Sequence, residues 1–318
     1  MRSILYFTLF LFVYCLKTNA QTNEEILKEL SDTEDPSSFR IGVGLGNKVF
    51  STHNNTLNAQ QNTSSLVFTP SIGYYHKSGI SLTATGYLLN SNGNSGLLQY
   101  AINPAYDYSN SDVSLSVSYT HYFTTTKYNT SLTPVQNDFF GSITSKKGWL
   151  RPGLQLGYSS GSYKEIVHVD TILKQGLIRT HYNFIDTSTT KLSNVSMSAL
   201  IEHPFTSQHI FAEKDQFSFI PQILGNFGSS KQNIVQSSSG SYSFLVKRKR
   251  AKKRLYKNNG TADYSSKFIL ESLGLNLEGD YGIGKFDIQP DLYLDYYIPS
   301  TTAKRLTEIF SIIFTYSF

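Results

Sequence analysis

Ser91 is the residue of this sequence that comes nearest to a catalytic nucleophile. It lies in the stretch Leu89-Asn90-Ser91-Asn92-Gly93-Asn94-Ser95, whose Asn, Gly and Ser residues are typical of turns. A serine hydroxyl becomes an activated nucleophile only when a neighbouring base takes its proton. The stretch holds no histidine. Its residue types therefore favour a turn over a hydrolytic site.

The same stretch is similar to the His-x-Ser-Asn-Gly-x-Ser motif of outer-membrane phospholipase A, a family of twelve-stranded barrels. Asn103 falls at the spacing of that family's third catalytic residue, but Leu89 stands where the motif has its histidine. The resemblance would imply a hydrolase with Ser91 as its nucleophile. Because Leu89 departs from the motif, we expect that the protein is not an enzyme.

Metal and thiol chemistry have little support in the sequence. Cys15 is the only cysteine. The histidines, including His76, His121, His168, His181, His203 and His209, are scattered and lack the spacing of metal ligands. No HExxH, P-loop or Gly-x-Ser-x-Gly motif occurs. We therefore expect no catalytic residues, no metal site and no cofactor.

A basic run interrupts the second half of the chain. Its members are Lys247, Arg248, Lys249, Arg250, Lys252, Lys253 and Arg254. In a cytosolic protein such a run would indicate nucleic-acid binding. The export signals described below exclude that compartment, so we expect no nucleic-acid partner. In a surface loop the run could clamp the phosphates of lipopolysaccharide or another anionic lipid, and a merely solvated loop is the alternative.

Charged residues also fall among the positions expected to face a barrel lumen. Asp287, Asp291 and Asp295 recur at every fourth position of one segment, and Arg40, Lys48 and Arg151 could face them across the interior. Charges that leave water must be paired or wetted. The sequence leaves two interpretations open: a closed set of lumen salt bridges, or a narrow polar conduit that prefers cations or sugars.

The last stretch, residues 306–318, organises the rest of the chain. Apolar residues, among them Phe314, Tyr316 and Phe318, alternate with Ser and Thr, which is the period of a strand with one apolar face. The stretch resembles the C-terminal signal of Gram-negative outer-membrane β-barrels, in which a terminal Phe follows apolar residues at alternating positions. The resemblance implies that the barrel-assembly machinery reads these three aromatic residues, and that the protein resides in the outer membrane.

The same alternation recurs from Phe39 onwards and predicts about twelve strands of the length that a tilted barrel strand needs. Tight turns alternate with longer connections, especially 159–193 and 228–266. Short periplasmic turns and long outer loops are typical of outer-membrane barrels. We therefore predict an all-β fold. It is a single transmembrane antiparallel barrel of about twelve strands, with about ten or fourteen as alternatives, and both termini are periplasmic.

Five prolines fall inside the predicted strands. They are Pro70, Pro104, Pro152, Pro221 and Pro290. Proline cannot donate to a strand ladder. We interpret the five as a belt of bulges or locally broken pairing on the lipid-facing side, near the inner rim. Misassigned or edge strands are the alternative.

The N-terminus predicts export. Arg2 precedes the apolar run 4–16, and Thr18-Asn19-Ala20 supplies the small residues that a signal peptidase requires. We predict a signal peptide over residues 1–20, a periplasmic leader over 21–38 and the barrel over 39–318. Cleavage would remove the cysteine and, with Arg2 and Lys17, lower the net charge from +5 to +3.

Three functional classes follow from these features. The small polar residues on the lumen side favour a narrow polar pore or a small-solute transporter in contact with outer-membrane lipid. The long loops and the basic run favour a structural or surface-binding barrel. An outer-membrane hydrolase is supported only by the Ser91 stretch.

Overall fold

The computed structural model describes residues 37–48, 62–91, 94–124, 135–175, 178–212, 215–246, 254–298 and 305–318. The predicted signal peptide, nearly all of the predicted leader and most of the basic run lie outside these residues. Within the described ranges, no helix is long and apolar enough to cross a membrane.

The described residues form fourteen strands of one antiparallel sheet. In chain order the strands are β1 (Ser38–Lys48), β2 (Asn62–Tyr75), β3 (Ile80–Ser91), β4 (Asn94–Ser109), β5 (Val113–Thr124), β6 (Asn137–Ser145), β7 (Arg151–Gln175), β8 (Ile178–Glu202), β9 (Phe205–Gln208), β10 (Asp215–Val246), β11 (Arg254–Ser265), β12 (Ile269–Ile283), β13 (Phe286–Tyr297) and β14 (Leu306–Ser317).

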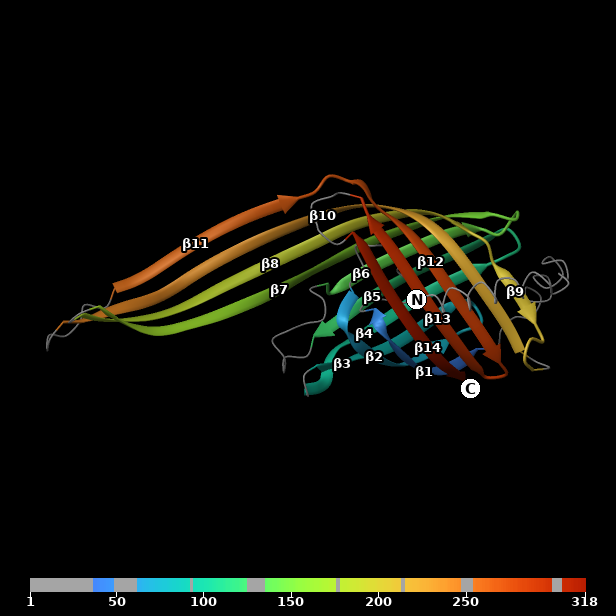
Figure 1. The fold of residues 1–318 in the computed structure, drawn as a ribbon, viewed down its shortest axis with the longest axis horizontal. Coiled ribbons are helices and arrows are strands. Elements are labelled where there is room, and N and C mark those ends of the chain that lie inside the picture. The colour runs from blue at the N-terminus through green and yellow to red at the C-terminus, as the bar shows by residue number, and fades with distance from the viewer. Residues whose placement is uncertain are drawn as a thin grey trace, which may run out of the picture.

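The sheet closes on itself, which confirms the predicted barrel of twelve strands (Figure 1). The last strand pairs with the first, from Arg40 opposite Ser317 to Gly46 opposite Ser311. The ring continues from β8 to β10 and from β10 to β12. The short β9 continues β8 along β10 in the same register, and β11 continues β12 along β10 beyond Ile269. The twelve-strand ring therefore carries the two short strands as extensions.

The alternation of side chains sorts the barrel into an apolar outside and a polar inside. On β1, Ile41, Val43 and Leu45 are exposed, while the intervening glycines are buried. On β13, Leu292 is exposed and Tyr293 is buried. A closed sheet leaves no unpaired edge, and an apolar exterior of this kind is stable when it faces hydrocarbon.

Aromatic side chains gather at both ends of this apolar exterior. At one end, Phe39 contacts Tyr74 with ring centroids 4.8 Å apart, and Phe286 contacts Tyr316 at 4.7 Å. At the other end, Tyr100 stacks on Phe123 at 4.7 Å. Two aromatic girdles bounding an apolar band are the mark of a barrel that spans a membrane.

One end of the barrel carries the tight turns, and we call it the short-turn rim. It comprises the turns at residues 76–79, 110–112, 146–150 and 284–285. Both described chain ends lie here, because the amide of Phe318 donates to the carbonyl of Phe39 at 2.9 Å, and the amide of Lys77 donates to Ser37 Oγ at 3.1 Å. At the same rim, burial and then the charge of Arg151 lower the pKa of Lys146, whose Nζ donates to Ser109 Oγ at 2.8 Å.

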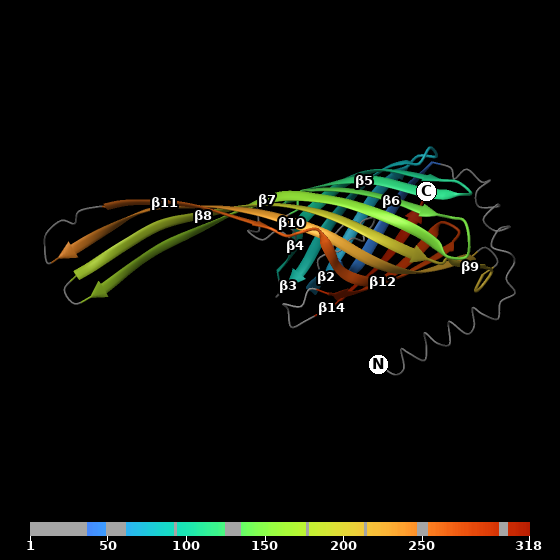
Figure 2. The same ribbon diagram turned by 90° about the horizontal axis from the view of Figure 1, so that it is seen from above.

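The opposite end departs from the prediction of long outer loops. Most of residues 159–193 and 228–266 are strand, and together they form a four-stranded sheet that projects from the barrel (Figures 1 and 2). We call this sheet the blade. It comprises residues 161–175 of β7, 178–192 of β8, 232–246 of β10 and β11. At about 3.3 Å per residue, these strands extend about 50 Å beyond the barrel.

The loop prediction was wrong because it depended on an apolar alternation that a doubly exposed sheet does not need. The blade is solvated on both faces, so Ser, Thr, Asn and Gln occupy much of its surface. Its strands are held by backbone pairing, which continues from β7 to β8 between Arg151 and Gln175 without a register shift. Pairing of this kind leaves little trace in the hydrophobic pattern.

The predicted proline belt is confirmed as locally broken pairing at three of its five members, whereas Pro152 and Pro221 each lie next to the end of a ladder, without a skipped pair. The β2–β3 ladder skips Thr69 and Pro70, the β4–β5 ladder skips Asn103 and Pro104, and the β12–β13 ladder skips Gln289 and Pro290. Each of these prolines remains paired on its other side. The register shifts of the described ladders occur elsewhere, after Gly46, Tyr87 and Asn226.

Candidate functional site: a polar cavity in the barrel lumen

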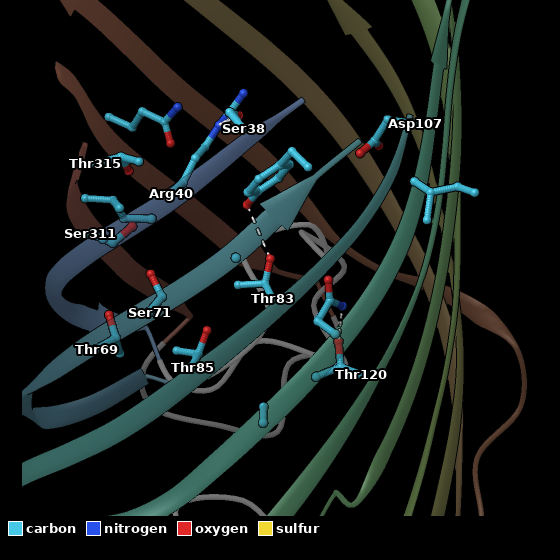
Figure 3. Close-up of a pocket in the computed structure, with 18 of the residues that line it drawn as sticks. Ser38, Arg40, Thr69, Ser71, Thr83, Thr85, Asp107, Thr120, Ser311 and Thr315 are labelled. Atoms are coloured by element: carbon cyan, nitrogen blue, oxygen red, sulfur yellow. Dashed lines mark hydrogen bonds between the residues drawn. The ribbon is translucent and has the colours of Figure 1, made fainter. Parts of the chain in front are cut away.

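A cavity of about 730 Å³ occupies the lumen beside β14 and β1 to β5 (Figure 3). The strand alternation directs short hydroxyl side chains into it from several neighbouring strands. Those labelled in the figure are Ser38, Thr69, Ser71, Thr83, Thr85, Thr120, Ser311 and Thr315. Residues of the turn 76–79 also line it, so the cavity reaches the short-turn rim.

The wall formed by β1 is smooth because glycines occupy its inward positions. A Cβ added at Gly44 would lie 2.3 Å from Thr69 Oγ1, which is far inside a normal contact. The hydroxyls of β2 therefore fill the space that side chains on β1 would need. A dense surface of backbone and hydroxyl groups offers many donors and acceptors with little net charge.

Arg40 supplies the main positive charge of the cavity near the rim. Its guanidinium lies over the ring of Tyr75, 4.3 Å from the centroid, and its Nε donates to Ser38 Oγ at 3.3 Å. Its charge interacts with that of Asp287 two strands away, beyond β14. The guanidinium thus lies against the wall, over the aromatic face of Tyr75.

Asn103 compensates for the donor that Pro104 lacks. Its side-chain amide donates to Thr120 Oγ1 at 2.6 Å and to the carbonyl of Tyr119 at 3.3 Å. Tyr119 lies opposite the proline, where the ladder skips a pair. The side chain therefore bridges the gap in the backbone pairing and adds a polar group to the cavity wall.

The other predicted lumen residues do not gather into one set with Arg40. Arg151 lies at the inward position opposite Glu202, and the two charges interact. Glu202 accepts a hydrogen bond from Gln222 Nε2 at 2.9 Å. Asp291 is inward and half-buried. The side chain of Lys48 lies outside the described side chains.

Asp295 belongs to a buried polar cluster that the sequence did not reveal. Tyr293 Oη donates to its Oδ1 at 3.1 Å, and Asn226 Nδ2 donates to Tyr293 Oη at 2.7 Å and to Ser272 Oγ at 3.0 Å. All four residues are at most 2% exposed. The cluster joins β10, β12 and β13, so it fixes the lumen wall opposite the cavity.

Tyr293 reaches Asn226 because Gly274 lies between them on β12. A Cβ at Gly274 would lie 2.6 Å from Tyr293 Oη and 2.8 Å from its ring. The same ring packs with Leu200, Leu224 and Ile309, which also point inward and are almost completely buried. This side of the lumen is therefore filled by side chains.

A second inward-facing cluster lies at the part of the cavity away from the short-turn rim. Tyr87 and Tyr122 pack with ring centroids 6.2 Å apart, together with Val67, Ala101 and Val135. Tyr87, Val67 and Ala101 also line the cavity. We call this cluster the tyrosine constriction. Here two aromatic rings in contact take the place of the hydroxyl groups that line the rest of the wall.

The structure separates the residues of the hydrolase hypothesis. Ser91 lies opposite Asn94 at the end of the β3–β4 hairpin, whereas Asn103 lies opposite Thr83. Eight residues of β3 separate these positions, which corresponds to about 26 Å. Their side chains therefore cannot form one site. Nor does any group of three His, Cys, Asp or Glu side chains in the described ranges lie close enough to hold a metal ion.

The remaining predicted residues lie outside the lumen. Phe314 and Phe318 are exposed on the outer surface, and the ring of Phe318 meets Tyr316 edge-on at 4.8 Å. Of the basic run, only Arg254 is described, as the first residue of β11. Lys247, Arg248, Lys249, Arg250, Lys252 and Lys253 lie outside the described residues.

No known protein family and no curated protein matches the sequence. Among solved structures, the chain is similar to a bacterial polysaccharide outer-membrane secretin, with 9% identity over 90% of this chain and 99% of that chain and a TM-score of 0.32. It is similar to the CymD monoaromatic hydrocarbon channel, with 10% identity over 91% and 90% of the two chains and a TM-score of 0.25.

A further similarity is to the outer-membrane channel DcaP of Acinetobacter baumannii, with 9% identity over 89% of this chain and 96% of that chain and a TM-score of 0.22. Because these TM-scores are low, we assign the fold from the strand pairing and from the apolar outer surface of the barrel. The closed ring of β-strands, the apolar band and the two girdles make this chain an outer-membrane-type β-barrel.

Proposed function

We propose that this protein is an outer-membrane barrel that admits a small polar solute to its lumen through the cavity at the short-turn rim. The observation that carries the proposal is the wall itself, in which hydroxyl groups from β14 and β1 to β5 converge on one cavity. Such groups bind hydroxyl-rich solutes by replacing their hydrogen bonds to water. A neutral, sugar-like solute fits this wall, and a small cation is the alternative.

The proposal includes the orientation of the barrel. Tight turns and both described chain ends lie at one rim, and the blade lies at the other. Outer-membrane barrels place short turns in the periplasm and long connections outside. The protein then enters the periplasm by its signal peptide, is inserted by the barrel-assembly machinery and displays the blade to the exterior. In this proposal it has no catalytic role.

In the proposed pore, the tyrosine constriction is the narrowest point and limits the passage of the solute. Tyr87 and Tyr122 are 5% and 2% exposed, so they leave little free space between them. Replacing Tyr87 with Ala removes one ring without touching the hydroxyl-lined wall. We expect this variant to admit sugars faster than the wild type does.

Proteoliposome swelling in sugars of increasing size tests the pore. We expect slow swelling with the wild type, faster swelling with Tyr87→Ala and no change with Tyr106→Ala. Tyr106 is a matched control because it is a lipid-facing tyrosine on a neighbouring strand, 41% exposed. If the wild type and Tyr87→Ala are both impermeable to sugars and show no steps in single-channel recordings with salt, the pore is excluded.

The blade favours a second candidate function, a barrel that displays a binding surface. A four-stranded sheet that projects far beyond the barrel adds nothing to a pore. Its test is a variant in which tight turns replace 161–192 and 232–265. We expect this variant to fold and to keep the wild-type swelling rate. Failure to fold would mean that the blade supports the barrel instead of serving display.

A further inference from the structure

Three lysines occupy the outer face of the sheet directly where the apolar band ends. On β7, β8 and β10 the lipid-facing positions Leu156, Met197 and Phe227 form the last fully apolar row, and Tyr158 and Val195 follow. The next three rows carry Lys231, Lys191 and Lys164, one in each row. All three lysines are exposed. We call them the lysine diagonal.

Register fixes the direction and the spacing of these lysines. The β7–β8 and β8–β10 ladders run through this region without a shift, so every second residue stays on the lipid-facing side. Lys191 lies opposite Ser162 and Asn233, two residues from Lys164 and Lys231 respectively. Diagonal neighbours of this kind are about 7–8 Å apart. The three ammonium groups therefore form a short line across three strands.

The lysine diagonal is not neutralised by the protein around it. Within the described residues, no salt bridge or hydrogen bond engages any of the three ammonium groups. The carboxylate on the same face nearest in register is Asp263, which lies beyond Asn233 and accepts a hydrogen bond from its side chain. Three like charges at this spacing repel one another unless anions lie among them.

We propose that the lysine diagonal binds the phosphate groups of outer-leaflet lipids and thereby fixes the depth of the barrel and the base of the blade in the membrane. The surface that presents the lysines is continuous with the lipid-facing wall, which places them at headgroup level. Their neighbours Ser160, Ser162 and Ser193 add hydroxyl donors to the same face. The assignment rests on the membrane location of the barrel and on the proposed orientation with the blade outside, and not on conduction through the lumen.

Native mass spectrometry of the detergent-solubilised full mature protein tests this proposal. Wild type, the triple variant Lys164→Gln/Lys191→Gln/Lys231→Gln and a control triple variant are titrated with bisphosphorylated lipid A and with phosphatidylcholine. The control is Lys77→Gln/Lys147→Gln/Lys285→Gln, because these exposed lysines lie in turns of the short-turn rim. All three proteins keep the basic run 247–254, so its contribution cancels.

We expect lipid A to bind about fivefold more weakly for each lysine removed, and about a hundredfold more weakly in the triple variant. The control and the titrations with phosphatidylcholine should change less than about twofold. Unchanged lipid A affinity in the triple variant would overturn the proposal. If the triple variant does not fold, Lys191→Gln alone should show the fivefold loss, and an unchanged affinity would overturn the proposal in the same way.

The phosphate groups that the lysine diagonal binds could also come from a soluble polyanion. Polyphosphate is titrated in parallel against wild type and the triple variant. We expect the substitution to weaken polyphosphate binding far less than lipid A binding, because the membrane face presents the lysines to lipid. An equal or larger loss with polyphosphate would overturn the assignment to membrane lipid.

Discussion

At the scale of single residues, the lumen depends on pairs in which one partner has almost no side chain. Tyr293 lies over Gly274 and reaches Asn226 beyond it, and the hydroxyls of β2 fill the space above Gly44. Parity along a strand predicted which residues point inward. It could not predict the Tyr293 cluster, because its members meet only through the register of β10, β12 and β13, which shifts at Asn226.

Replacing Gly274 with Ala tests the first of these pairs. The new Cβ would overlap the Tyr293 ring, so the ring must leave its buried partners, and we expect a loss of about 1–3 kcal/mol in the free energy of unfolding. Gly141→Ala is the control, since its Cβ would meet only one atom, at 3.9 Å. Urea unfolding in lipid vesicles measures both. Equal stability of the two variants would contradict the packing described for Tyr293.

Neighbouring residues of β13 test the assignment of the two faces. Leu292 is on the lipid-facing side, so Leu292→Arg places a charge in hydrocarbon at a cost of about 2–4 kcal/mol near the midplane. Asp291→Arg, one residue earlier, points into the polar interior and should be better tolerated. Assembly yield in vesicles compares the two. Greater damage from Asp291→Arg would reverse the assigned parity.

At the scale of elements, the twelve barrel strands could be predicted because lipid imposes an apolar residue at every second position. Leu154, Leu156 and Tyr158 show this on β7, and the pattern stops at Ser160 although the strand continues to Gln175. Beyond the membrane, water contacts both faces of the sheet, so neither face requires apolar residues. Backbone pairing with β8 then stabilises the strand. The sequence pattern of one strand does not show which strand it pairs with, so this part of β7 could not be predicted.

The two ends of these elements should differ in access from outside the cell. Cleavage of the predicted signal peptide would remove Cys15, so Ser239→Cys on the blade and Ser111→Cys in a tight turn would each provide a single thiol; both serines are exposed. With an impermeant maleimide on intact cells, we expect Ser239→Cys to react and Ser111→Cys to react only after the outer membrane is permeabilised. The opposite pattern would invert the proposed orientation.

At the scale of the whole molecule, charge divides the chain into two regions. Residues 159–193 and 228–266, which include the blade, contain 13 Lys and Arg against 4 Asp and Glu, so their net charge of +9 exceeds the +5 of the full chain. The rest of the chain has a net charge of −4, of which residues 1–38 supply −3, so the barrel itself is nearly neutral at −1. A basic projection on a nearly neutral barrel suits a protein whose outer part faces anionic lipid.

Assembly of the whole barrel tests the C-terminal signal. Phe318→Ser should sharply lower the amount of protein in the outer membrane, because the terminal aromatic is the residue that the assembly machinery is expected to read. Phe211→Ser is the control, an aromatic of the same rim that is 83% exposed. Heat-modifiable mobility in gels measures folded protein. Equal levels of the two variants would refute the signal.

The long strand β10 gives the molecule a mechanical property. Twenty-five consecutive residues, Gln222–Val246, pair with β8 in one register from the barrel wall to the far part of the blade. A pull along the blade loads these pairs in shear, and many hydrogen bonds lying across the strands must yield together. The blade therefore acts as a stiff lever without a hinge in β8 or β10. A force on the far end of the blade would be transmitted along β10 to Leu224 and Asn226. These two residues contact the side chains that fill the lumen.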